Sequence, residues 1–136
     1  MAYSTRADIE ARFGRGAVLG FVDDDASGAA ASDEAAFISS AIATADHQID
    51  SMLSNRYGVP FTTPPDLVRD LSCDLAFYEM SKRRGRLDAF IDKIRGDAER
   101  VLRELSGGQR SLPGVVPAIY AQSTTSGEDA SAIDEW

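Results

Sequence analysis

The stretch that decides the fold is DEAAFISSAIATADHQIDSML, residues 33–53. Its main apolar residues recur mostly at steps of three or four positions, the spacing of one face of an α-helix: Ile38, Ile42, Ala45, Ile49, Met52 and Leu53. Its acidic residues, including Asp46 and Asp50, fall largely outside that face. Asp33 or Ser32 can cap the start, and Gly58 is expected to end the helix. The pattern predicts one long amphipathic helix.

On the N-terminal side, a short helix is expected to begin after Thr5. Thr5 and Asp8 have the spacing of a capping box, in which two side chains satisfy the first free N–H groups of a helix. Gly14 suits the end of this helix. Residues 14–31 are rich in Gly and Ala and predict a connection with room for one helical turn near residues 17–21.

On the C-terminal side, two more helices are expected. Pro65 suits an early position of the first, which ends at Gly85, and the second runs from about Asp88 to Leu105, before Gly107 and Gly108. Prolines make residues 59–65 an extended connector. Helical spacing again marks the apolar faces. From all the predicted helices, six residues should be buried: Ile42, Ile49, Leu71, Leu75, Ile94 and Leu102.

The chain as a whole therefore predicts an all-α fold, a small bundle of about four helices with an extended C-terminal arm. Residues 1–108 form the helical core and residues 109–136 the arm, which is rich in Ser, Thr and Gly. A length of 136 residues with 43% hydrophobic and 26% charged residues suits a single domain. The arm keeps one compact apolar stretch, from Val115 to Tyr120.

Composition excludes several classes of function. The net charge of −8 argues against general affinity for nucleic acid. One Cys and one His exclude a disulfide framework, a Cys-rich zinc site and any motif that needs two histidines. Apolar runs are too short for a membrane span, and no signal stretch opens the chain. We expect an intracellular protein that is not an enzyme, with no cofactor, no metal and no membrane partner.

An acidic loop resembles a calcium-binding pattern. Asp23, Asp25, Ser27, Gly28 and Glu34 stand at loop positions 1, 3, 5, 6 and 12, where carboxylates, a turn glycine and a closing Glu are usual. Ala30 stands where an apolar anchor is usual, and no clear helix precedes the loop. We expect a solvated turn that caps the next helix and no bound cation; a calcium site is the alternative.

Three groups of residues are candidates for a protein interface. A basic group lies where the third helix ends; it either complements the helix dipole in solvent or meets an acidic partner surface. Arg56 and Tyr57 either stack locally or anchor an interface. Large apolar residues of the arm suit a segment held by another chain. The full set is Lys82, Arg83, Arg84, Arg86, Arg56, Tyr57, Val115, Val116, Ile119, Tyr120, Ile133 and Trp136. Cys73 is expected to be a buried, inert thiol and His47 a surface residue.

A set of short motifs, in order along the chain, resembles a known family. The set is Tyr3-Ser4-Thr5, Asp8-Ile9, Arg12-Phe13-Gly14, Ala41-Ile42-Ala43, Ala45, Ile49-Asp50, Leu53, Arg56-Tyr57, Pro60, Cys73-Asp74-Leu75-Ala76, Tyr78 and the segment from Leu102 to Gly108. It is similar to the small head–tail connector (adaptor, or head-completion) proteins of tailed bacteriophages, in the branch found in Mu-like phages and prophages. The resemblance spans residues 3–112.

The resemblance implies a non-enzymatic, all-helical protein of the virion neck, assembled in the host cytoplasm. Such proteins form a ring, usually twelvefold, beneath the portal protein and present a platform to a stopper, terminator or tail protein. Genome DNA passes through the axial channel without sequence-specific binding, and in several connector families the C-terminal arm reaches into the portal. The alternative is a soluble helical regulatory or antitoxin-like binding protein, monomeric or dimeric, without a ring.

Overall fold

The structure is a computed structural model that describes residues 2–22 and 31–115. These residues form five helices: α1 (Arg6–Phe13), α2 (Arg15–Val22), α3 (Ala31–Leu53), α4 (Asp66–Arg83) and α5 (Ala89–Gly107). The described ranges contain no strand. The predicted all-α bundle is confirmed. The connection before α3 differs, because a complete eight-residue helix, α2, replaces the single turn expected near residues 17–21.

The predicted starts and ends of the helices are largely confirmed by their hydrogen bonds. Thr5 Oγ1 accepts from the Asp8 N–H at 3.2 Å, and Asp8 Oδ2 accepts from the Thr5 N–H at 3.0 Å, which completes the capping box. Asp88 Oδ1 accepts from the Ile91 N–H at 2.9 Å at the start of α5. Gly108 ends α5 with φ of 86°, in the left-handed region that glycine adopts without steric cost.

Three predicted helix boundaries were wrong. α3 already begins at Ala31, so Ser32 and Asp33 lie inside the helix and do not precede it as caps. α3 ends at Leu53, not at Gly58, because the chain turns so that the N–H of Tyr57 donates to the carbonyl of Leu53 at 2.8 Å. This turn sends the Tyr57 side chain into the core. Pro65 lies just before α4 rather than inside it, with extended backbone angles (φ −63°, ψ 159°). All three differences concern residues at helix ends, where local patterns are weakest.

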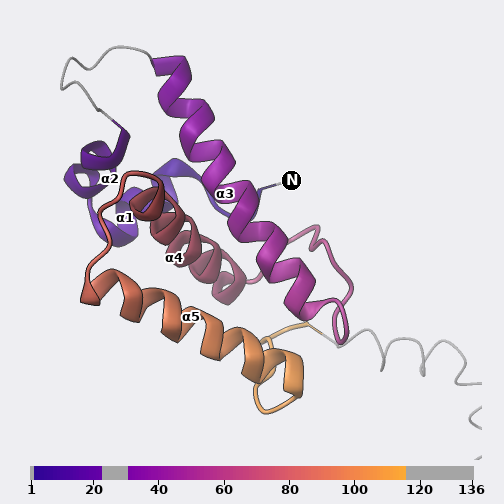
Figure 1. Cartoon of the computed structure of the whole chain (residues 1–136). Coiled ribbons are helices and arrows are strands. Elements are labelled where there is room, and N and C mark those ends of the chain that lie inside the picture. Colours follow the sequence, from indigo (N-terminus) through magenta and orange to yellow (C-terminus); the bar gives the residue numbers. More distant parts are fainter. Residues whose placement is uncertain (1, 23–30, 116–136) are drawn as a thin grey trace, which may run out of the picture.

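α4 is the central helix of the bundle. It packs between α3 and α5, and α1 and α2 also lie against it (Figure 1). Five of the six residues expected in the core are buried, namely Ile42, Ile49, Leu71, Leu75 and Leu102, and Cys73 is buried among them. The sixth, Ile94, is only half-buried because it faces an open cleft between α4 and α5.

Core packing continues beyond residue 108. Leu112 is buried, and its N–H donates to the hydroxyl of Tyr57 at 3.2 Å. Arg110 pairs with Glu104 at 2.9 Å, which ties the chain back to α5. The first residues assigned to the arm thus lie on the bundle, and residues 116–136 fall outside the described part. No helix in the described part is long and apolar enough to cross a membrane.

Candidate interaction surfaces

The basic group at the end of α4 is used within the chain. Arg83 donates from Nη1 to Ser40 Oγ at 2.9 Å and from Nη2 to Thr44 Oγ1 at 3.1 Å, both on α3. The Arg84 guanidinium lies 4.2 Å from the centre of the Phe37 ring, a cation–π contact. These two arginines therefore fasten the end of α4 to α3.

The other two residues of this group reach in different directions. Arg86 donates from Nη1 to the carbonyl of Gly20, which ties the turn after α4 to α2. Lys82 lies 3.9 Å from Glu79, and 57% of its side chain is exposed. Three of the four basic residues thus hold the bundle together, and more than half of the Lys82 side chain remains in solvent.

Tyr57 does not belong to an exposed interface. It is only 1% exposed, and its hydroxyl accepts the hydrogen bond from Leu112. Of the two alternatives predicted for Tyr57, the structure favours local packing over an interface anchor, because the turn after α3 points its ring inward, beside Phe61 at 6.4 Å between ring centres. Arg56 is half-buried, and its guanidinium lies over Gly108, where an added Cβ would be 3.2 Å from Nη1.

The apolar residues of the arm are described only at its beginning. Val115 is half-buried, and its N–H donates to the carbonyl of Leu112 at 3.3 Å. Five further candidates, Val116, Ile119, Tyr120, Ile133 and Trp136, lie outside the described residues. The acidic loop with Asp23, Asp25 and Ser27 also lies outside them, as does the side chain of Glu34.

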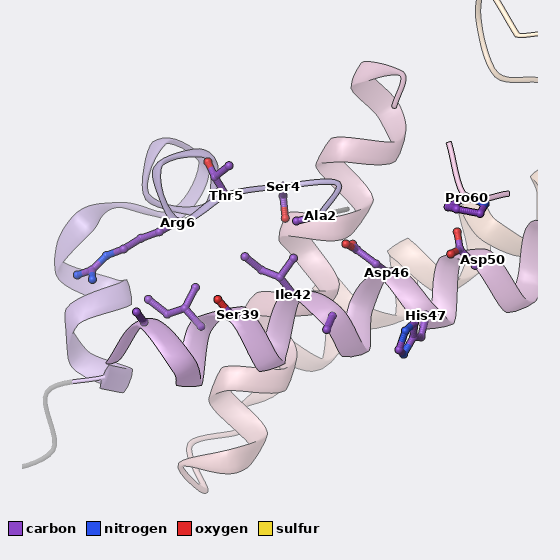
Figure 2. Close-up of a pocket in the computed structure, with 13 residues that line it drawn as sticks. Ala2, Ser4, Thr5, Arg6, Ser39, Ile42, Asp46, His47, Asp50 and Pro60 are labelled. Atoms are coloured by element: carbon purple, nitrogen blue, oxygen red, sulfur yellow. The ribbon is translucent and has the colours of Figure 1, made fainter. Parts of the chain in front are cut away.

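A groove of about 620 Å³ runs between the N-terminal segment and α3. Ile38 and Ile42 form its apolar floor, with Ala35 and Ala43 on the same helix. Figure 2 shows Ile42 pointing from α3 toward the segment that carries Ala2 and Ser4. The polar groups around it are Ser4, Thr5, Arg6, Ser39, Asp46, His47 and Asp50. We call this hollow the α3 groove; the sequence pattern did not predict it, because it forms only where the chain's N-terminal residues meet α3.

A buried polar network holds the N-terminal segment against α3 and α4. Asp46, only 6% exposed, accepts from the Tyr3 N–H at 2.9 Å and from Ser72 Oγ at 2.6 Å. Ser72 also lies 2.7 Å from Ser4 Oγ. The Tyr3 hydroxyl donates to Asp50 and accepts from the Phe61 N–H at 3.0 Å. Asp46 was expected on the polar face of its helix; it is buried because it supplies acceptors to both neighbouring segments.

Burial controls the ionisation of this network. Loss of water raises the pKa of Asp46, and the hydrogen bonds from Ser72 and Tyr3 oppose this only in part. Burial and the hydrogen bond to Asp50 also raise the pKa of the Tyr3 hydroxyl. A carboxyl group with a raised pKa is more easily protonated in the folded protein than in the unfolded chain.

A second hollow, of about 500 Å³, lies where α1, α4 and α5 meet. Phe13 stacks on Phe77 with ring centres 4.0 Å apart, and Phe90 lies at the edge with 64% of its surface exposed. Arg12 binds Asp74 through Nε at 2.5 Å and Nη2 at 3.1 Å. Burial raises the pKa of Asp74 despite this pair. We call this hollow the α5 cleft.

Groups that could do chemistry are few in the described part of the chain. The Cys73 thiol is buried, and burial raises its pKa to about 11, so it is protonated at neutral pH. His47 is exposed on α3, as expected. Within residues 2–22 and 31–115, no three His, Cys, Asp or Glu residues come together as a metal site would require.

Comparison with known families decides the identity of the chain. The family described as "Bacteriophage Mu, Gp36" matches residues 3–131. The chain belongs to this family. No curated protein matches it significantly. The Gp36 match includes all five helices and most of the arm, and extends past residue 112, where the sequence resemblance ended. It confirms a Mu-like phage protein; the family description names no role, so the connector role stays a prediction.

Proposed function

We propose that this Gp36-family protein is a structural head–tail connector (adaptor) of a Mu-like phage. In this role it forms a ring in the virion neck, between the portal protein and the stopper or tail components, and the genome passes through the axial channel. The observation that carries the proposal is the family match over residues 3–131, to a family of bacteriophage Mu. The resemblance to connector proteins supplies the specific role.

Features of the chain support a structural role. The bundle is small and all-helical, with hollows on two sides that can receive other chains. The only cysteine of the sequence is protonated at neutral pH and buried, which makes it a poor nucleophile. A net charge of −8 suits the wall of a channel through which DNA slides, because acidic surfaces repel phosphates. We therefore propose passage of DNA without specific binding.

The competing role is a helical regulatory or antitoxin-like binding protein without a ring. The two roles predict different masses for the assembled protein and different binding partners. We would measure the mass of the purified full-length chain, of the portal ring from the same phage, and of their mixture. A connector adds a fixed number of copies to the portal ring, twelve in the proposed arrangement. A monomer or dimer that never joins the portal would overturn the connector role.

The arm is proposed to attach the connector to the portal, and the structure improves the truncation that tests this. Leu112 and Val115 pack on the bundle, so a deletion should begin at residue 116. Deleting residues 116–136 should leave the thermal unfolding of the helical core unchanged and abolish stable attachment to the portal. Attachment at the wild-type copy number would show that the arm is not the docking element.

A further inference from the structure

Two large apolar side chains are left in water at the start of α5. Leu87 is 44% exposed and Phe90 is 64% exposed, the highest values among the large hydrophobic residues of the described chain. The cap that Asp88 forms with the Ile91 N–H holds this corner in a defined geometry. A rigid, exposed aromatic beside a second apolar residue is typical of a binding hot spot. We call Leu87 and Phe90 the α5 knob.

The α3 groove offers a site of matching chemistry. Its floor is apolar, and Ala35 and Ala43 lie on the same helix, where short side chains leave room above Ile38 and Ile42. A volume of about 620 Å³ lies within the range of sites that enclose small organic groups, so an aromatic ring fits with space for a second side chain. The rim is polar, as it is around most interface cores.

Knob and groove lie on different surfaces of the same chain. The groove is built from the N-terminal segment, α3 and Pro60, whereas Phe90 lines the α5 cleft with residues of α1, α4 and α5. No residue lines both hollows. α5 meets α3 and the turn after it farther along, where Gln48 bonds Glu99 and Asn55 bonds Ser106, so the start of α5 lies away from the groove (Figure 1).

We propose that the α5 knob of one copy inserts into the α3 groove of a second copy. Such a contact joins two different surfaces, so an open row of copies keeps a free knob at one end and a free groove at the other. Repetition closes into a ring when the rotation between neighbours allows it. The inference rests on the proposed function and deepens it, since it names the contact between neighbouring copies in the proposed ring.

The first test compares knob and groove variants of the full-length chain by mass measurement over a range of concentrations. Phe90→Asp removes the aromatic ring of the knob and Ala43→Trp fills the groove; both positions are exposed, so the fold is kept. Each variant should associate at least roughly thirtyfold more weakly than the wild type, the effect of losing a hot spot. Matched controls, Arg103→Ala on α5 and Ala36→Trp on α3, are exposed outside both hollows and should associate normally.

Mixing the two variants tests the head-to-tail geometry. Phe90→Asp keeps its groove and Ala43→Trp keeps its knob, so an equimolar mixture should form dimers that grow no further. A symmetric contact of knob with knob would let Ala43→Trp, whose knob is intact, associate with itself in the absence of Phe90→Asp, and this result would overturn the proposal. Loss of self-association on deletion of residues 116–136, with the knob and groove intact, would overturn it as well and assign the groove to the arm.

Cross-linking gives a second readout. Lys93→Cys, one turn along α5 from Phe90, mixed with Ser39→Cys on the rim of the groove should form a disulfide-linked dimer on mild oxidation, while buried Cys73 stays reduced. A wild-type chain that is monomeric at every concentration, together with no disulfide between the two introduced thiols, would overturn the interface. These experiments contain no portal protein, so that result would not bear on the proposed attachment to the portal, which the mass measurement of the mixture with the portal ring tests separately.

Discussion

α3 and α4 are joined by polar side chains at two places, and the two joints differ in kind. In the first half of α4, Ser72 Oγ donates to Asp46 inside the protein, and Asp46 also accepts from the Tyr3 N–H. Near its end, Arg83 reaches over the surface to Ser40 and Thr44. The contact of Ser72 with Asp46, which we call the inner joint, uses short side chains that are buried away from water. The contact of Arg83 with Ser40 and Thr44, which we call the outer joint, uses a long side chain whose hydrogen bonds water can replace.

The difference teaches where polar contacts are energetically important in this bundle. A buried carboxylate that loses a partner leaves another polar group without water or a hydrogen bond, which costs the full desolvation penalty. An exposed arginine that loses its partner is solvated at once. The same pair of helices should therefore respond very differently to substitutions at its two ends.

The largest effect is expected from the apolar contacts between the two joints. Ile49 is completely buried on α3, so Ile49→Ala should lower the free energy of unfolding by about 2–5 kcal/mol. Ile94→Ala is the matched control, because Ile94 is half-buried and should cost clearly less. Urea unfolding measures both. Equal losses would mean that Ile94 is as fully packed as Ile49, against the structure.

Asp46→Ala should break the inner joint. The change leaves the Tyr3 N–H without its acceptor and Ser72 without one of its partners, and we expect a loss of about 1–3 kcal/mol in unfolding free energy. Asp46→Asn is the matched control, because the amide keeps an acceptor for Tyr3 and can donate to Ser72 Oγ. If the alanine and asparagine variants are equally stable, the hydrogen bonds of the inner joint contribute little.

The inner joint should also respond to pH. Burial raises the pKa of Asp46 above its ordinary value of 3.8, so the charged form costs stability at neutral pH. As the pH falls from the raised value toward 3.8, the folded state takes up the proton first, and the wild type should gain stability relative to Asp46→Asn. Asp74 has a raised pKa as well, but it is present in both variants and cancels. Urea unfolding between neutral pH and about pH 4 tests this. A stability difference that stays constant, or that shifts against the wild type in acid, would contradict it.

The smallest effect is expected at the outer joint. Arg83→Ala should lower the unfolding free energy by less than about 1 kcal/mol, because its contacts are exposed. Lys82→Ala, which removes an exposed charge 3.9 Å from Glu79, should lie within about 0.5 kcal/mol of wild type. Thermal unfolding at low and high salt measures both. A loss at Arg83 as large as that of Asp46→Ala would erase the contrast between the two joints.

Features that depend on local pattern could be predicted. The periodicity of Ile38, Ile42 and Ile49 indicated the long helix, and the Thr5–Asp8 spacing indicated the capping box. Both are properties of residues within one or two helical turns, so no distant partner is needed. Ile94 shares that periodicity yet is half-buried, because the packing of α5 on α4 leaves a cleft at its position.

The candidate surfaces were harder to predict than the helices. Arg83, Arg84 and Arg86 form a basic cluster in the sequence, but their partners Ser40, Phe37 and Gly20 lie more than forty positions away. Phe90 and its neighbour Ile91 are both apolar, but Ile91 is buried and Phe90 lies in water, a difference that the tertiary packing of α5 decides.

The sequence by itself determined the all-helical class, the long amphipathic helix α3, the capping of α1 and membership of the Gp36 family. Only the tertiary structure decided that Tyr57 and Asp46 are buried and that a groove runs along α3. The reason is that helix formation depends on residues three or four positions apart. Burial depends on which distant segments meet: Tyr3 and Asp46 are 43 positions apart, and Tyr57 and Leu112 are 55 apart.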